Sequence, residues 1–262
     1  MRILSWNINS VRLRLPLLLT LAEQLQPDVM ALQELKAETA LFPAAALAAA
    51  GYVHQQVCGQ KGYNGVAIVS RQPLEGLPGP DWCGKGDARH VAVRHASSGI
   101  AIHNFYIPAG GDIPDPAVNP KFAHKLQFLD ELQQWQAFET GEKAILLGDL
   151  NIAPLPEDVW SHRQLLDVVS HTPIEVEKLT GLQQRSGWVD THRLLTPPPA
   201  RLYSWWSYRA KDWGASNRGR RLDHIWASPA LAPQLTGAGI FTEPRSWDSP
   251  SDHVPVWADF SL

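Results

Sequence analysis

Acidic, amide and histidine side chains gather in a few short segments that could do chemistry together. Each segment stands at or just beyond the end of a run rich in β-forming residues. The segments are Asn7-Ile8-Asn9, Gln33-Glu34, Asn104-Phe105-Tyr106, Gly148-Asp149-Leu150-Asn151, Leu222-Asp223-His224 and Ser251-Asp252-His253. Residues two apart on an extended chain point to the same side, so Asp149 and Asn151 can act at one place.

Carboxylate and amide oxygens of this kind suit a hard divalent cation. Mg²⁺ or Mn²⁺ binds oxygen ligands and offsets the negative charge that builds on a phosphoryl group during cleavage. The sequence has no cluster of cysteines or histidines of the kind that zinc or copper prefers. The candidate cation ligands are Asn7, Glu34, Asp149, Asn151, Asp252 and His253.

Cleavage of a phosphodiester also needs a group that takes a proton from water. His253 is the candidate base, and Asp223 is the candidate carboxylate that fixes its tautomer. Taken alone, each segment is more often a turn or a helix cap, and Tyr106 is more often a core aromatic. His224 shares a strand face with apolar neighbours, so we expect it to be structural. Only the conjunction of segments favours an active site.

The elements that must position these residues alternate between two periodicities. Short runs typical of strands are Arg2–Trp6, Asp28–Gln33, Gly65–Ser70, His90–His95, Ile100–Ile107, Lys143–Leu147, Arg221–Ala227 and Val254–Phe260. Helices are predicted over Val11–Gln26, Pro43–Ala50 and Asn119–Glu139, the second ended by Gly51. Loops rich in proline or glycine are expected at Gln72–Gly86, Ala109–Pro120 and Thr196–Pro199.

The predicted helix over Asn119–Glu139 has two faces. Its apolar face carries Phe122, Leu126, Leu129, Leu132 and Trp135, and its polar face carries Lys121, Lys125, Asp130 and Glu131. Strand groups separated by such helices predict an α/β fold in which sheets pack together and helices cover them. The 262 residues could form one domain or two, but no stretch resembles a linker, so one domain is favoured.

The composition is that of a soluble globular protein, with 44% hydrophobic and 19% charged residues. A formal charge of -3 argues against a purely electrostatic DNA binder. Cys58 and Cys83 are expected to be free thiols in a reducing compartment. No apolar run reaches the roughly 18 residues of a membrane span, and we expect a cytoplasmic protein.

Four of the segments closely resemble those of the exonuclease III family, within the endonuclease/exonuclease/phosphatase superfamily. They are Leu4-Ser5-Trp6-Asn7-Ile8-Asn9, Leu32-Gln33-Glu34-Leu35-Lys36, Gly148-Asp149-Leu150-Asn151-Ile152-Ala153-Pro154 and Pro250-Ser251-Asp252-His253-Val254-Pro255-Val256. The blocks at 59–67 and 203–209 are similar to family blocks that most lipid- or sugar-phosphate-cleaving branches lack. The resemblance covers essentially the whole chain.

The resemblance implies a four-layered α/β sandwich, in which two packed mixed β-sheets are flanked by helices, as a single domain over residues 1–262. It implies Mg²⁺, or Mn²⁺ in its place, held chiefly by Glu34. His253 and Asp223 would activate water, Asp149 would move a proton, and Asn151 and Tyr106 would bind phosphoryl oxygens. The implied activities are 3′-to-5′ exonuclease, incision at abasic sites and cleaning of 3′ ends.

The implied partner is double-stranded DNA, and we expect a monomer because nothing in the sequence demands a partner subunit. Candidate DNA contacts are Lys61, Arg89, Trp205, Arg209 and Arg220, with further basic residues at Arg218, Arg221 and Lys211. We expect Arg220 and Arg221 to meet phosphates or stabilise Asp223. Trp205 and Trp206 should point to opposite faces of a strand, one of them into the core, and the resemblance assigns the DNA contact to Trp205.

The sequence departs from the family pattern in two places. Ala109-Gly110-Gly111 stands where a polar residue is expected, and the stretch between Ala153 and Trp188 is short for the family. The first removes support for contacts to the opposite DNA strand there, and the second, which would shape the wall around a damaged nucleotide, leaves open the balance between abasic-site incision and trimming of 3′ ends. One alternative is a phosphodiesterase or phosphatase of another branch of the superfamily, acting on inositol phosphates or lipids. Another is a DNA-binding module without catalytic activity.

Overall fold

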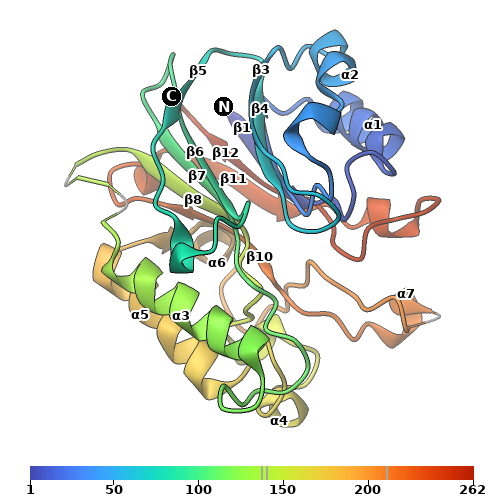
Figure 1. Ribbon diagram of the computed structural model, residues 1–262, viewed down its shortest axis with the longest axis vertical. Helices are drawn as coiled ribbons and strands as arrows, with labels where there is room; N and C mark the ends of the chain where they lie inside the picture. The colour runs from blue at the N-terminus through green and yellow to red at the C-terminus, as the bar shows by residue number, and fades with distance from the viewer. Residues whose placement is uncertain (137, 140, 211) are drawn as a thin grey trace.

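Two β-sheets pack face to face in this computed structural model, and helices cover their outer faces (Figure 1). The structure describes residues 1–136, 138–139, 141–210 and 212–262. Each sheet has six strands and is mixed, because one neighbouring pair is parallel and the others are antiparallel. The four-layered α/β sandwich is therefore confirmed.

The first sheet has the order β11-β12-β1-β2-β4-β3. Its strands are β11 (Leu235–Ile240), β12 (Val256–Phe260), β1 (Arg2–Asn7), β2 (Val29–Gln33), β4 (Val66–Ser70) and β3 (His54–Cys58). The second sheet has the order β5-β6-β7-β8-β10-β9. Its strands are β5 (Leu74–Leu77), β6 (His90–His95), β7 (Ala101–Tyr106), β8 (Ala144–Asp149), β10 (Asp223–Ala227) and β9 (Val189–Asp190).

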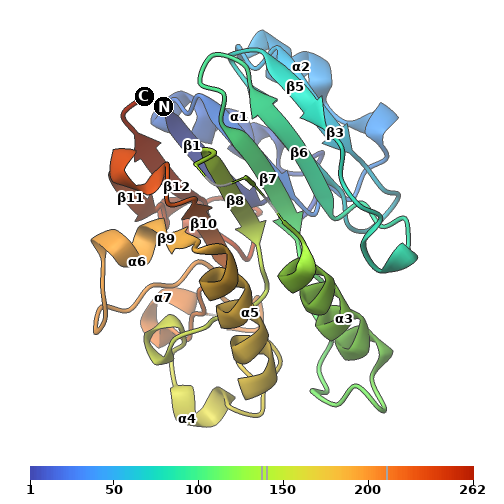
Figure 2. The same cartoon turned by 90° about the vertical axis from the view of Figure 1, so that its left-hand side faces the viewer.

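The helices divide between the two outer faces. Helices α1 (Leu15–Leu25) and α2 (Ala44–Ala49) pack on the first sheet, and α3 (Pro120–Gln134) and α5 (Pro173–Ser186) pack on the second. The latter two lie side by side in both views (Figure 2). Short helices are α4 (His162–Leu165), α6 (Thr191–Leu195) and α7 (Trp213–Ser216).

Alternation along the strands divides the core into layers. In β8, Ile145 and Leu147 enter the core between the sheets, whereas Ala144 and Leu146 pack under α3 and α5. In β1, Ile3 lies between the sheets, whereas Leu4 and Trp6 pack against α1. Successive strand residues point to opposite faces, so both faces of each sheet are apolar.

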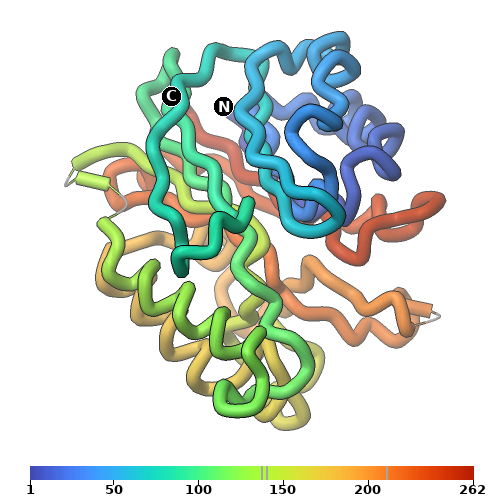
Figure 3. Tube along the Cα trace, viewed as in Figure 1, coloured from blue at the N-terminus to red at the C-terminus, as the bar shows by residue number. Residues whose placement is uncertain are grey.

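The two ends of the chain lie side by side (Figure 3). The terminal ammonium of Met1 donates to the carbonyl of Phe260 at 2.6 Å, and the amide of Phe260 donates back to Met1 at 2.9 Å. The antiparallel pairing of β1 with β12 continues from this contact. It brings residues near position 7 and residues near position 253 to the same end of the sheet.

Several predicted bounds were wrong by part of a turn or more. Helix α1 begins at Leu15, not Val11. A helix that began at Val11 would need an N–H at position 16, which proline lacks, whereas in the first turn of a helix that N–H has no partner to lose. Helix α3 ends at Gln134, since the backbone of Trp135 is extended. Lys125, predicted on the polar face of α3, is fully buried. Strand β5 lies inside the predicted loop 72–86, and β3, β9, β11 and α5 were not predicted.

Two expectations about the whole chain were also tested. Both Cys58 and Cys83 are free thiols, as predicted. In the part of the chain that the structure describes, no helix combines the length and the apolar character that crossing a bilayer requires.

Candidate active site

Because side chains alternate along a strand, the polar residues at the ends of β1 and β8 point into the space between the two sheets, as apolar core residues earlier in the same strands do. Residues 3, 5 and 7 of β1 face the second sheet, and 145, 147 and 149 of β8 face the first. Register aligns these ends, because Asp149 pairs with both Tyr106 and Asp223. The apolar core therefore gives way at one edge to a buried polar cluster.

Unusual backbone conformations surround this edge. Gly148 has φ +133°, and a Cβ there would lie 2.0 Å from the carbonyl oxygen of Phe105, so no other residue fits. Glu34 and Asn151 have φ +50° and +54°, in the left-handed region that residues other than glycine rarely adopt. Such strained residues concentrate at functional sites.

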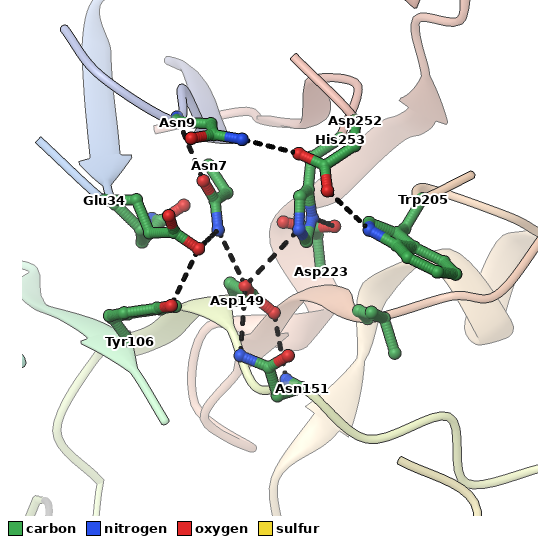
Figure 4. Close-up of polar contacts among 12 residues, drawn as sticks. Asn7, Asn9, Glu34, Tyr106, Asp149, Asn151, Trp205, Asp223, Asp252 and His253 are labelled. Atoms are coloured by element: carbon green, nitrogen blue, oxygen red, sulfur yellow. Dashed lines mark hydrogen bonds and ion pairs between the residues drawn. The ribbon is translucent and has the colours of Figure 1, made fainter. Parts of the chain in front are cut away.

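Asp149 lies at the centre of the cluster and is 1% exposed (Figure 4). The side-chain amide of Asn7 donates to Asp149 at 2.8 Å and to Glu34 at 3.1 Å, so it joins the two acids. Asn151 donates to Asp149 through its backbone at 2.9 Å and its side chain at 3.1 Å. Asn7 thus turns its nitrogen to the carboxylates, whereas its oxygen accepts the amide of Asn9.

Glu34 is held in its ionised form. The ammonium of Lys36 lies 2.9 Å from one carboxylate oxygen, and the hydroxyl of Tyr106 donates to the other at 2.7 Å. Burial opposes ionisation, but Lys36, Tyr106 and Asn7 together hold the pKa of Glu34 below its ordinary value. Burial and the nearby Glu34 and Asp149 raise the pKa of Tyr106 well above its ordinary value, so its hydroxyl keeps its proton.

His253 lies between two carboxylates. Its Nδ1 is 2.8 Å from Asp223, and its Nε2 is 3.6 Å from Asp149. Burial favours a neutral ring, but Asp223 and Asp149 outweigh it and raise the pKa of His253 to about 10. Burial raises the pKa of Asp149 to about 7 despite the neighbouring imidazole, and Asp223 adds to the rise. The predicted pairing of His253 with Asp223 is thus observed, and the cluster retains a proton near neutral pH.

Asp252 closes the opposite side. One carboxylate oxygen accepts the side-chain amide of Asn9 at 3.0 Å, and the other accepts the indole N–H of Trp205 at 2.9 Å. Burial disfavours its charge, but His253, Asn9 and Trp205 hold the pKa of Asp252 below its ordinary value. Asp252 is therefore ionised, like Glu34.

A cleft of about 670 Å³ opens over this cluster. Glu34, Asn151, Asp252 and His253 line its floor, and Trp160, Trp205, Arg209, Arg218 and Arg220 line its walls. Glu34 and Asp252 thus line the same cleft, although they are 218 positions apart in the sequence.

The predicted DNA contacts divide into two groups. Trp205, Arg209 and Arg220 line the cleft. Lys61 and Arg89, both in the described part of the chain, lie outside its lining, and Arg89 pairs with Asp87 at 3.1 Å. Lys211 lies outside the described residues.

The two tryptophans separate as predicted, although they do not lie in a regular strand. Trp205 forms only isolated bridges, to Arg220 and His253. Trp206 is 4% exposed and packs with Tyr203 and Val254. Trp205 is the one that borders the cleft.

Some predicted polar residues are structural. Arg221 is fully buried and binds Asp158 at 2.7 Å and Asp190 at 2.7 Å, so the expectation that it meets a phosphate or Asp223 was wrong. Neither of these two acids lines the cleft. His224 is buried and bonds to the carbonyl of Ile152 at 2.9 Å, as a structural residue would.

Sequence reasoning assigned no role to two polar residues beside the cluster. Ser204 donates to Asp223 at 2.6 Å and accepts the amide of Leu222 at 3.0 Å. Asn9 joins Lys36 to Asp252. Asn9 belongs to one of the segments that the sequence singles out, and its spacing from Asn7, which is that of Asn151 from Asp149, could have assigned it to the site. Ser204 carries no such signal.

The donors present fit a hard cation. Asp149, Asp223 and His253 offer ligand atoms within 4.8 Å of one another and could hold a metal ion. His253 already shares a short contact with Asp223, however, and a protonated ring is not a ligand. Glu34 and Asp252 are ionised oxygen donors that face the cleft, which is the chemistry that Mg²⁺ or Mn²⁺ requires.

Comparison with known proteins agrees with this geometry. Residues 4–253 match the Endonuclease/Exonuclease/phosphatase family. Exodeoxyribonuclease III of Haemophilus influenzae is 30% identical over 99% of this chain and 100% of its own. An AP endonuclease structure from Archaeoglobus fulgidus has a TM-score of 0.93 at 32% identity, and the match covers both chains fully.

A 3′-5′ exonuclease, NExo, from Neisseria meningitidis has a TM-score of 0.90 at 34% identity, with both chains fully covered. A second structure, of 3′ phosphatase NExo bound to a product DNA hairpin, gives the same TM-score at 33% identity and the same coverage. The chain therefore belongs to the endonuclease/exonuclease/phosphatase family, in its exonuclease III branch.

Proposed function

We propose that this protein is a magnesium-dependent DNA repair nuclease that hydrolyses phosphodiester bonds of double-stranded DNA. Its activities are 3′-to-5′ exonuclease, incision at abasic sites and removal of blocking groups from 3′ ends. The observation that carries the proposal is the position of Asp149 between the Asn7–Glu34 pair and the His253–Asp223 pair, beneath the floor of the cleft. The relatives named as exonuclease, AP endonuclease and 3′ phosphatase support it.

Glu34 would be the chief ligand of Mg²⁺, for which Mn²⁺ can substitute, with Asp252, Asp149, Asn151, Asn7 and His253 around it. The cation would supply charge neutralisation for the phosphoryl oxygens and the leaving oxygen. Lys36, which pairs with Glu34, would shift toward solvent or substrate. The side-chain nitrogen of Asn7 faces the acids, so in this orientation Asn7 would hold Glu34 and Asp149 in place. Its oxygen would reach the cation only after the side-chain amide turns over.

The proton-handling residues follow from the contacts. His253, oriented by Asp223 and protonated at neutral pH, would contact the scissile phosphate, so the proton taken from water would pass to Asp149. Asp149, with a pKa near neutrality, would take a proton from the nucleophile or pass one to the leaving 3′ oxygen. Tyr106 and Asn151 would donate hydrogen bonds to phosphoryl oxygens, each stabilising the transition state by about 3 kcal/mol.

DNA would be held by the cleft walls and the surface around them. Trp205 offers an indole face to a base or to the space left by a missing one. Arg209 and Arg220 would meet phosphates, and Lys61 and Arg89 would extend the contact beyond the cleft. We further propose that the chain works as one domain and as a monomer, because residues from Asn7 to His253 of a single chain build one site. We also propose a cytoplasmic location, in which free thiols such as Cys58 and Cys83 persist.

A panel of substrates with Mg²⁺ tests the proposal. The panel holds duplex DNA with an abasic analogue, duplex with a recessed 3′ end, duplex with a 3′ phosphate, and a phosphoinositide. We expect hydrolysis of DNA substrates, lost with a chelator and restored by Mg²⁺. Cleavage of the phosphoinositide alone would move the protein to another branch of the superfamily, and DNA binding without cleavage of any substrate would make it a binding module.

A further inference from the structure

Lys125 of α3 is fully buried, and all three of its N–H donors are used. Its ammonium donates to the carbonyl of Asn151 at 2.8 Å, to the carbonyl of Ala109 at 3.3 Å, and to the carboxylate of Glu175 in a close ion pair. An ammonium has three donors, so its charge and its geometry are both satisfied. Lys125 thereby joins α3 to the backbone that follows Asp149.

Glu175 of α5 is fully buried as well, and both of its carboxylate oxygens are engaged. Both oxygens accept the amide of Ser170 at 3.0 Å, and one also accepts the hydroxyl of Thr172 at 2.6 Å. Glu175 is thus both the partner of Lys125 and the residue that fixes the turn before α5.

The residues held by this pair are strained. Asn151 has φ +54° and Ser170 has φ +88°. The two turns are joined, because the amide of Ala153 donates to the carbonyl of Ser170 at 2.8 Å. Residues other than glycine keep such backbone conformations only where surrounding contacts enforce them. Lys125 and Glu175 supply such contacts to both turns.

Both turns face the cleft. Asn151 lines the floor and donates to Asp149, which lies beneath it. On the wall, the hydroxyl of Ser170 accepts a hydrogen bond from Arg220 at 2.8 Å, and the Arg220 guanidinium lies 5.2 Å from the centre of the Trp205 ring. Lys125 and Glu175 lie behind these residues, and neither lines the cleft.

We propose that Lys125 and Glu175 are positioning residues, which fix Asn151 against Asp149 and Ser170 against Arg220. This role rests on the proposed function of the cleft. Stability alone does not account for the pair, because a neutral replacement of a buried ion pair is often neutral or stabilising. The need to hold two strained turns of the site in place explains why both charges are kept at full burial, because each of them bonds to one of these turns.

The test is the double variant Lys125→Met/Glu175→Gln, which leaves no charge unpaired. The amide that replaces the carboxylate at position 175 keeps one acceptor oxygen for Ser170 and loses the other, so the 168–172 turn should loosen while the contact of Ser170 with Arg220, and with it DNA binding, persists. We expect kcat on the preferred DNA substrate to fall about 100-fold, because misplacement by about 1 Å costs that much, with KM within about threefold of wild type. Because neither residue transfers a proton and their opposite charges are removed together, the shape of the pH profile should not change.

Lys178→Met is the matched control. Lys178 pairs with Asp130 and also joins α5 to α3, but at the surface, where Asp130 is half exposed. We expect kcat and KM of this variant to equal those of wild type.

A double variant with native circular dichroism and kcat within about threefold of wild type would overturn the proposal. If the double variant does not fold, Glu175→Asp decides, because it keeps both charges and withdraws the carboxylate by one methylene: a fall in kcat of about fivefold or more supports positioning, and a smaller change overturns it.

Hydrogen exchange separates this proposal from the proposed function. In the double variant, peptides covering 149–153 and 168–172 should exchange about tenfold faster than in wild type, while strand peptides are unchanged. Unchanged exchange in both turns would overturn the positioning role. If wild type cleaves no DNA, the proposed function fails, and exchange alone still shows whether the pair holds the turns.

Discussion

The Nε2 atom of His253 lies 3.6 Å from a carboxylate oxygen of Asp149, and both side chains are buried beneath the cleft. Burial raises the pKa of Asp149 to about 7, and the two carboxylates beside His253 raise its pKa to about 10. Near neutral pH His253 therefore keeps its proton, whereas Asp149 can accept a proton and return it during hydrolysis.

Asp149→Asn should abolish turnover without loss of the fold. Removing a residue that transfers a proton costs about 100- to 10,000-fold in rate. The fold should be retained, because burial penalises the carboxylate and an amide escapes that cost. Single-turnover rates and thermal unfolding measure both effects. Near-native rates from folded Asp149→Asn would show that its role is misassigned.

His253 should make the stability of the cation-free protein depend on pH. Its pKa is raised on folding from 6.5 to about 10, so folding binds its proton more tightly. This stabilisation is complete below pH 6.5 and is lost as the pH rises toward 10. Wild type should therefore lose more unfolding free energy than His253→Asn between these limits in urea titrations. Equal losses in the two proteins would contradict a protonated His253.

Glu34→Gln should weaken cation binding. The change removes an ionised oxygen donor that faces the cleft, so we expect Mg²⁺ or Mn²⁺ affinity to fall about tenfold or more. Titration calorimetry with Mn²⁺ measures the affinity, and excess Mg²⁺ should restore part of the activity. Glu38→Gln, at an exposed position in the same loop, is the control. Equal affinities in wild type and Glu34→Gln would exclude Glu34 as the chief ligand.

Trp205→Ala and Trp206→Ala should have different effects. Trp205 borders the cleft, and loss of its stacking should weaken DNA binding by about 1–3 kcal/mol. Trp206 is buried, and its loss should lower the free energy of unfolding by about 3–5 kcal/mol. Fluorescence anisotropy and urea unfolding distinguish them. Unaltered DNA affinity in Trp205→Ala would remove it from the interface.

DNA affinity should fall steeply with salt, because phosphate contacts release counterions. Arg209 is exposed and lines the cleft, so Arg209→Ala should lower the slope of log affinity against log salt by about one. Anisotropy at several salt concentrations measures the slope. A flat affinity from low to moderate salt would contradict the proposed grip on phosphates.

Much of the fold could be predicted, because strands buried on one or both faces leave clear apolar patterns. The strands that were missed are irregular or exposed at the edges: β5 is half exposed, and β9 has two residues. Lys125 could not be placed from helical spacing, because its partner Glu175 lies on another helix, 50 positions later by their numbers. Periodicity reports which face is apolar, but not which charge finds a buried partner.

The site was more predictable than its contacts. The residues that converge on the cleft stand at strand ends, and that signal is local. Arg221 and Arg220 are adjacent in the sequence, yet one binds Asp158 and Asp190 in the core and the other faces the cleft. Their difference depends on tertiary partners, which spacing does not reveal.

The location of the cation is the most direct test of the site. Anomalous diffraction from crystals soaked in Mn²⁺ would place it without reference to activity. We expect a peak within about 2.2 Å of a Glu34 carboxylate oxygen, on the cleft side and bordered by Asp252. A peak held by Asp223 and His253, with Glu34 still paired to Lys36, would contradict the proposed cation site.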